Sequence, residues 1–130
     1  MKDLENIFKD SNIDFAIQFG STATGQNHKN SDVDIAVFVD QKIKKLERFE
    51  IKLGLMTKLG KHYKKNMDIV ILNDTNSLFF KYVILKEGKL IHMNSEDSYF
   101  DFACKTLSNY FDYEPFLMEY NKNYVQKYLQ

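Results

Sequence analysis

Residues 19–38 read FGSTATGQNHKNSDVDIAVF, and this stretch decides how the chain folds. Before it, residues 13–19 (IDFAIQF) alternate around Phe15, Ile17 and Phe19 and stop at Gly20, which predicts a strand that feeds a tight turn. The last part of the quoted stretch lies in residues 32–39 (DVDIAVFV). After the two aspartates this segment is apolar almost without a break, as expected of a strand that is covered on both faces. The polar residues between the two strands are enough for a helical turn or two and a loop.

The remaining chain alternates predicted helices with predicted strands. Apolar spacing predicts a short helix around Leu4–Phe8, a long helix from Gln41 to about Tyr63, and a helix over Ser77–Glu87 with Gly88 as its left-handed cap. The long helix rests on the recurrence of six apolar residues: Ile43, Leu46, Phe49, Leu53, Met56 and Leu59. Residues 67–72 (MDIVIL) predict a third strand, and residues 89–93 a short extended segment.

Two further helical segments, from Ser95 and from Pro115, predict a helical hairpin over about 95–130. The expected fold class is therefore α/β (α+β), a small mixed β-sheet flanked by helices, in a single domain over residues 1–130. A length of 130 residues with 44% hydrophobic composition fits one core.

Composition excludes several classes of protein. The formal net charge is zero, so direct nucleic-acid binding, as by a polymerase on long templates, is not expected. No apolar run approaches the roughly 18 residues that span a bilayer, so neither membrane nor signal peptide is expected. Cys104 is the only cysteine, which fits a cytoplasmic address and a small core residue. Arg48 is the only arginine, so lysines and backbone amides must bind any phosphate.

The chemistry centres on an Asp-x-Asp pair. Asp32 and Asp34, at i and i+2 on a strand, project from one face about 6.7 Å apart. Adjacent carboxylates repel each other unless they share a cation. Mg²⁺ prefers oxygen ligands and commonly takes one or two carboxylates, with water and substrate phosphates completing its shell. The pair therefore predicts a nucleoside triphosphate substrate.

Two further features complete the predicted site. Gly20 lets the backbone approach a phosphate closely, and Ser21 adds a hydroxyl donor. Asp68 opens the third strand, where it can hold metal and activate an incoming hydroxyl. An Asp-x-Asp pair alone is commonly just a solvated pair; the ordered combination is what predicts nucleotidyl transfer.

The quoted stretch resembles the signature of the DNA polymerase β-like nucleotidyltransferases, and specifically of their minimal (MNT) members, the antitoxins of HEPN/MNT toxin–antitoxin pairs. The resemblance extends over MDIVILND, EGKLIHM and YFDYEPFLMEYNKNYVQKYL. It implies ATP as co-substrate, Mg²⁺, and metal binding and catalysis by Asp32, Asp34 and Asp68. It further implies transfer of AMP onto a tyrosine of a partner HEPN ribonuclease, in a hetero-oligomer that silences this toxin.

One departure from the family pattern is visible. Members often carry arginine just before the glycine that matches Gly25, whereas this chain has Thr24. Lys29 is the candidate replacement for the triphosphate contact, which makes Gly20, Ser21 and Lys29 the predicted nucleotide-binding residues.

Other interpretations stay open at this point. The chain could adenylylate a small hydroxyl compound such as an antibiotic, or act as a non-catalytic antitoxin that only binds its partner. The basic cluster of residues 58–65 either complements the end of the long helix or contacts phosphate or an acidic partner. The aromatic tail is either a packing stripe or part of a protein interface.

Overall fold

The structure is a computed structural model that describes residues 2–9, 12–20 and 32–129 of the chain, with side chains for 4–9, 12–20 and 32–112. Its elements follow the predicted order of helices and strands closely. They are α1 (Lys2–Lys9), β1 (Ile13–Phe19), β2 (Val33–Val39), α2 (Lys45–Tyr63), β3 (Met67–Ile71), the 3-10 turn η1 (Leu72–Asp74), α3 (Leu78–Glu87), β4 (Lys89–Met93) and α4 (Glu96–Leu129).

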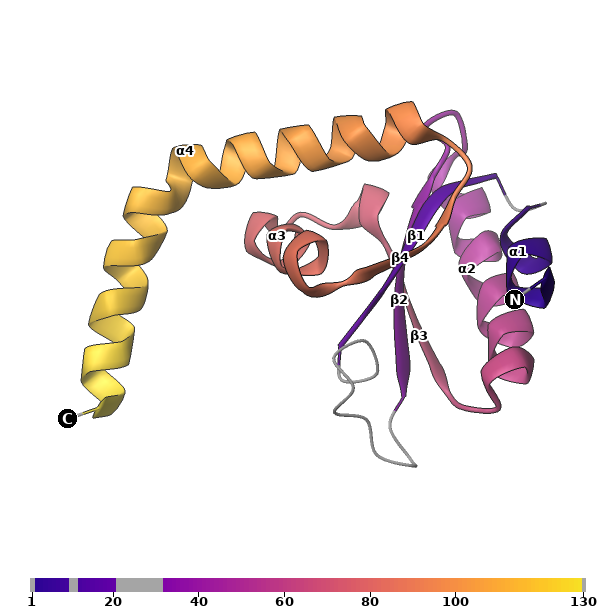
Figure 1. The fold of residues 1–130 in the computed structure, drawn as a ribbon, viewed down its shortest axis with the longest axis horizontal. Coiled ribbons are helices and arrows are strands. Elements are labelled where there is room, and N and C mark those ends of the chain that lie inside the picture. Colours follow the sequence, from indigo (N-terminus) through magenta and orange to yellow (C-terminus); the bar gives the residue numbers. More distant parts are fainter. Residues whose placement is uncertain (1, 10–11, 21–31, 130) are drawn as a thin grey trace.

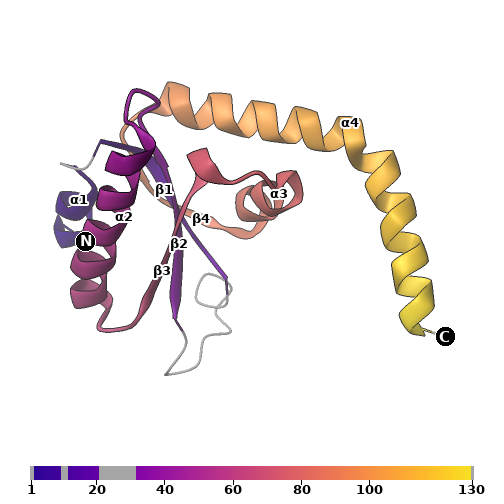
Figure 2. The ribbon, with the colours of Figure 1, turned by 180° about the vertical axis from the view of Figure 1, so that it is seen from behind.

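The described strands form one mixed sheet in the order β3-β2-β1-β4. β1 pairs antiparallel with β2 and β4, whereas β2 pairs parallel with β3 across the connection that contains α2. Helices α1 and α2 cover one face of the sheet, and α3 and the start of α4 cover the other (Figures 1 and 2). The predicted fold class, a small mixed sheet flanked by helices, is confirmed.

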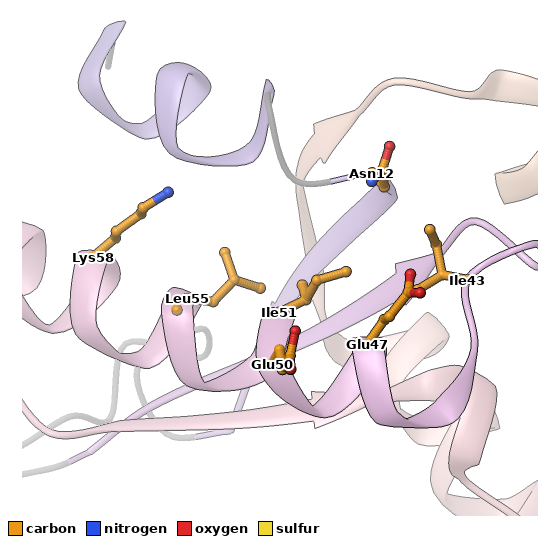
Figure 3. Close-up of a pocket in the computed structure, with 8 residues that line it drawn as sticks. Asn12, Ile43, Glu47, Glu50, Ile51, Leu55 and Lys58 are labelled. Atoms are coloured by element: carbon orange, nitrogen blue, oxygen red, sulfur yellow. The ribbon is translucent and has the colours of Figure 1, made fainter.

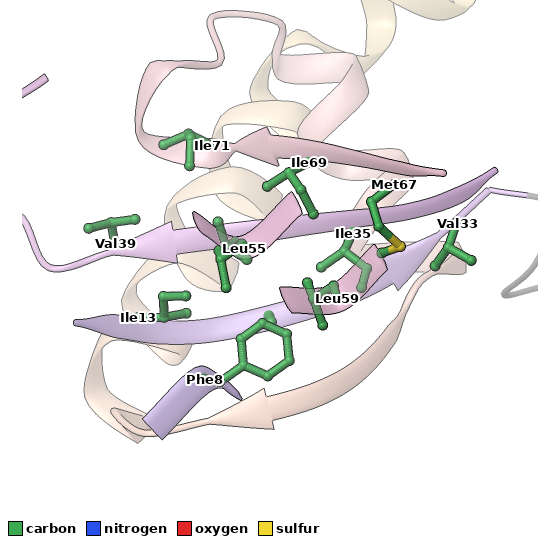
Figure 4. Close-up of a cluster of buried hydrophobic side chains, with 12 residues drawn as sticks. Phe8, Ile13, Val33, Ile35, Val39, Leu55, Leu59, Met67, Ile69 and Ile71 are labelled. Atoms are coloured by element: carbon green, nitrogen blue, oxygen red, sulfur yellow. The ribbon is translucent and has the colours of Figure 1, made fainter. Parts of the chain in front are cut away.

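Both faces of the sheet bury apolar side chains. On the α2 side, Ile35 and Val37 of β2 are fully buried in a cluster with Leu55 of α2 (Figure 4). On the opposite side, Ala36 of β2 packs in a second cluster with Phe15. Because successive residues of a strand point to opposite faces, a strand between two clusters must be apolar at every position. This explains the unbroken run in the sequence of β2.

Helix α2 is confirmed, but its buried face is not the one that the sequence spacing suggested. Ile51, Leu55 and Leu59 face the sheet. Four of the six residues behind the prediction are instead exposed, by 37% to 73%: Leu46, Phe49, Leu53 and Met56. Apolar residues occupy both sides of α2, so periodicity alone could establish a helix without establishing which side is covered.

The single arginine has a structural role. Arg48 donates from Nε and Nη2 to the carboxylate of Asp74, at 3.1 and 2.6 Å, and from Nη1 to the carbonyl of Ile43 at 2.8 Å. The hydrogen bonds from Arg48 lower the pKa of Asp74. This two-pronged contact fastens the start of α2 to the turn that follows β3.

The same turn is also fastened to the end of β2. The side-chain amide of Asn73 donates to the carbonyl of Val39 at 2.8 Å, and its oxygen accepts from the Val39 N–H at 2.9 Å. One side chain thus replaces the hydrogen bonds of a further strand residue.

The C-terminal region differs from the predicted hairpin. Both predicted segments are helical, but they join into one continuous helix, α4, which bends partway along and leaves the domain (Figures 1 and 2). Pro115 lies inside this helix and has no N–H to donate to the preceding turn. A proline inside a helix commonly bends it without ending it, which is consistent with a helix that continues past Pro115.

Two smaller expectations were wrong. Gly88 caps α3, but with an extended φ of −78° rather than a left-handed one. A glycine is needed there because a Cβ would collide with the side chain of Ile17 and the carbonyl of Ile84. Cys104 is exposed on α4 rather than buried in the core. Within the described residues, no helix is both long and apolar enough to cross a membrane.

The burial of α2 gives a direct stability test. Leu55→Ala should lower the free energy of unfolding by about 2–5 kcal/mol because it leaves a cavity in the core. Leu53→Ala, on the exposed side of the same helix, should change it by less than about 0.5 kcal/mol. Urea unfolding followed by circular dichroism measures both, and equal losses would contradict the assigned face.

Candidate functional site

The acidic residues meet at one end of the sheet. The strand register places Phe19 of β1 opposite Asp34 of β2, and Asp34 opposite Asp68 of β3. Asp34 lies two residues before Ala36 and Asp68 two before Val70, so both carboxylates share the face that α3 and α4 cover. They sit at the open end of this face, where β2 and β3 begin.

Asp34 is the centre of the acidic group. Its side chain lies beside that of Asp68, its register partner, and it is half-buried while Asp32 and Asp68 are exposed. Burial raises the pKa of Asp34, and the negative charges of Asp68 and Asp32 raise it further. Two carboxylates held this close repel each other, so the arrangement favours a cation that both can share.

Gly20 lies directly beside this centre. Its φ of +78° belongs to the left-handed region, which glycine adopts without a steric penalty. A Cβ at this position would also collide with the carboxylate of Asp34. Glycine is therefore required at position 20 for two reasons. It permits the turn, and it lets the backbone come close to the carboxylate of Asp34.

The other predicted phosphate ligands lie outside the described residues. Ser21 and Lys29, together with Thr24, Gly25 and His28, belong to the segment 21–31 that the structure does not describe. Their predicted contacts with a triphosphate remain predictions.

The arrangement of the acids fits a magnesium ion that is bound by two carboxylates, without a complete set of protein ligands. Among the residues that the structure describes, no group of three His, Cys, Asp or Glu side chains stands ready to hold a metal ion. Asp34 and Asp68 are the close pair, and Asp32 acts on Asp34 through its charge alone. One or two carboxylates are the usual protein ligands of Mg²⁺, with water and phosphate oxygens supplying the rest. The carboxylates of Asp34 and Asp68 are therefore suitable ligands for Mg²⁺.

Two aromatic side chains, Phe19 and Phe80, lie next to the row of the sheet that carries the acids, and the sequence analysis did not indicate them. Phe19 shares the cross-strand row with Asp34, and Phe80 of α3 meets its ring edge-on at 5.6 Å. Sequence analysis treated Phe19 only as a strand residue. Its position immediately before Gly20 was the available signal, whereas the contribution of Phe80 depends on how α3 packs.

The basic cluster lies at the same end of the sheet. Lys61 and His62 occupy the last turn of α2, and Lys64 ends it in a left-handed conformation, with its N–H donating to Gly60. Asn66 then accepts from the N–H of Val33 at 3.0 Å, which brings this connection next to the start of β2. The lysine positions fit the predicted role of complementing the helix dipole.

A hollow of about 510 Å³ lies on the other side of the sheet (Figure 3). It runs along α2 near Asn12, and its charged lining residues are Glu47, Glu50 and Lys58. Because α2 covers the face opposite Asp34 and Asp68, this hollow is separate from the acidic site.

Comparison with known proteins agrees with this geometry. A sequence profile of the family described as polymerase beta, nucleotidyltransferase matches residues 2–97. The protein adenylyltransferase MntA of Shewanella oneidensis is 32% identical over 92 residues, which are 71% of this chain and 62% of that protein. The chain therefore matches less than two thirds of the length of this curated relative.

Solved structures share the fold. A crystal structure of a toxin–antitoxin with AMP-PNP has a TM-score of 0.69 at 24% identity and covers 99% of this chain and 98% of its own. The tri-AMPylated Shewanella oneidensis HEPN toxin in complex with MNT antitoxin has a TM-score of 0.60 at 22% identity, covering 96% and 92%. The family profile spans every element from α1 to β4, including the acidic pair and Gly20. The chain belongs to the polymerase β nucleotidyltransferase family.

Proposed function

We propose that this chain transfers AMP from ATP to a hydroxyl group, a tyrosine of a partner HEPN ribonuclease, and so acts as the antitoxin of that ribonuclease. The observation that carries the proposal is the close pair of Asp34 and Asp68 beside the bend at Gly20. The likeness to a protein adenylyltransferase supplies the transferred group.

The acids would divide the work between them. We assign metal binding to Asp32, Asp34 and Asp68; Mg²⁺, when bound, supplies positive charge that offsets the carboxylates and the triphosphate. Asp68 is the exposed member of the close pair, so it is the one that an acceptor hydroxyl can reach and the one to take its proton. The new bond joins the acceptor oxygen to the α-phosphorus, the bond from that phosphorus to the bridging oxygen breaks, and pyrophosphate leaves with the electron pair.

The backbone at Gly20 leaves room for the phosphates. With no side chain on that residue, a triphosphate can approach the strand end next to Asp34. We assign Ser21 and Lys29 to the same phosphates, as the sequence predicts.

A macromolecular acceptor is favoured over a small one. The elements from α1 to β4 make up the family unit, and α4 extends largely beyond it. Structural neighbours include an AMPylated HEPN toxin in complex with an MNT antitoxin. The exposed thiol of Cys104 would stay reduced in the cytoplasm, which is the compartment we propose.

The transfer itself is the first test. Asp34→Asn and Asp68→Asn should each lower label transfer from α-³²P-ATP to the purified partner HEPN ribonuclease by about 100-fold or more, since each removes a charge at the reacting centre. Asp40→Asn, at the far end of β2, is the matched control and should leave transfer unchanged.

The same variants separate the catalytic antitoxin from the two alternatives. If Asp34→Asn still protects cells that express the ribonuclease, the chain neutralises its partner by binding alone. If label appears only on a small hydroxyl compound, the protein acceptor is wrong.

Gly20 gives an independent test of the site. Gly20→Ala should abolish label transfer because the added methyl group displaces the carboxylate of Asp34 and strains a positive φ. Gly54→Ala is the control, because a Cβ there meets nothing within 4 Å. Transfer by Gly20→Ala at the wild-type rate would contradict the assigned position of the phosphates.

The raised pKa of Asp34 predicts a response to pH and to magnesium. A carboxyl whose pKa is higher in the folded than in the unfolded state costs stability above that pKa, and the cost disappears as the pH falls through it. Asp68→Asn removes a repelling charge, so it should raise the Tm of the metal-free protein at pH 7, with a difference that shrinks on acidification.

Magnesium supplies the second half of this test. Mg²⁺ should raise the Tm of the wild-type protein and leave that of Asp68→Asn nearly unchanged, since the variant retains one member of the close pair. Thermal scans with and without MgCl₂ between pH 4 and 8 measure both effects. An equal magnesium response in the two proteins would refute a shared metal site.

A further inference from the structure

Helix α4 carries two apolar faces, and only one of them is used within the described residues. Phe102 and Thr106 are buried against the domain, and Tyr110 stacks on Tyr82 of α3 with ring centroids 3.7 Å apart. More than a third of a turn away around the helix, Phe100 and Phe111 are exposed by 54% and 55%.

The exposed face has the spacing of a helix–helix contact. Phe100, Cys104, Leu107 and Phe111 follow one another at intervals of four, three and four residues, and together they form what we term the α4 seam, in which Leu107 is half-buried and the other three are exposed. Such a spacing keeps apolar side chains in line along one side of a helix and is typical of a surface that packs against another helix. The seam therefore fits a helical partner.

The position of α4 relates the seam to the acidic site. The helix starts on the face of the sheet that carries Asp34 and Asp68, then stands out from the domain and bends on that same side (Figures 1 and 2). A protein that lies along α4 is on the side from which the acids can be reached. The exposed stripe of α2 faces the opposite way.

Charge indicates what kind of surface fits the seam. Residues 96–112 carry four exposed carboxylates, Glu96, Asp97, Asp101 and Asp112, against a single lysine. That lysine, Lys105, already pairs with Asp101 at 3.1 Å. A ribonuclease must present a basic surface to hold the phosphates of RNA. An apolar seam bordered by carboxylates complements such a surface.

The seam also lies outside the part of the chain that the family profile covers. The profile ends at residue 97, whereas the seam begins at Phe100. The acidic pair and Gly20 belong to the profile, so the shared chemistry does not depend on the seam.

We propose that the α4 seam docks the ribonuclease partner through a basic, helical surface and so brings its acceptor hydroxyl to the acid-bearing face of the sheet. This inference rests on the proposed function, and it adds the surface that selects the acceptor.

Binding of the full-length protein to the purified partner HEPN ribonuclease tests the docking directly. The double variant Phe100→Ala/Phe111→Ala should raise the Kd, measured by titration calorimetry without nucleotide, by at least about tenfold. Phe49→Ala/Leu53→Ala on α2 is the matched control, because these side chains are exposed by a similar 54% and 49%, and it should leave the Kd unchanged. In transfer assays, the α4 double variant should raise the KM for the partner and retain kcat.

A charge variant keeps the test decisive if the double variant fails to fold. Asp112→Lys replaces an exposed carboxylate beside the seam, so it should weaken binding, and the loss should diminish as salt concentration rises. Circular dichroism melting checks that each variant is folded.

Three results would overturn the docking surface. They are an unchanged Kd in both α4 variants, a larger loss in the α2 control, and a wild-type dimer that the α4 variants break without affecting partner binding. The last result would assign the seam to a second copy of the chain. Failure of the proposed function looks different, because the wild-type protein would then bind the partner through α4 but leave it unlabelled.

Discussion

The structure depends on keeping two carboxylates side by side at the start of two parallel strands. Asp34 and Asp68 face each other in register and repel each other, so nothing in their own interaction holds them together except a shared proton or cation. The surrounding strands supply that restraint. Ile35 and Ile69, the next residues along, are buried under α2, and a slip of one residue would turn each acid into the core and each apolar side chain out of it.

Contacts remote from the acids support the same register. Asn73 joins the end of β2 to the turn after β3, and Arg48 joins that turn to the start of α2. The connection between the parallel strands is therefore fastened at the end opposite the site. Among the residues that the structure describes, no helix is fastened over the opposite end of the sheet, where Gly20 and Asp68 are exposed.

Much of this was predictable from the sequence because the strands are buried on both sides. Continuous apolar runs located β2 and β3 to within a residue or two, whereas Asp32 lies just before β2, so its place on the face of Asp34 remains a prediction. The convergence of Asp68 on Asp34 followed from an ordinary parallel crossover. Phe80 could not be placed beside the acids in the same way, because its position depends on the packing of α3 over β1.

The helices were less predictable for a physical reason. α2 and α4 are apolar on more than one side, so the period of 3.6 residues identified them as helices but could not say which side the sheet would cover. The sequence around Pro115 was compatible with a new helix as well as with a bent one. Gly88 was recognised as a cap, but the reason for it is the side chain of Ile17, which only the packing brings near.

The bend in α4 changes the direction of this helix after it has left the sheet (Figure 1). The acids and their supporting strands are built from residues that end before α4 begins at Glu96. The course of the outer part of α4 can therefore vary without moving the strands that hold Asp34 and Asp68 in register.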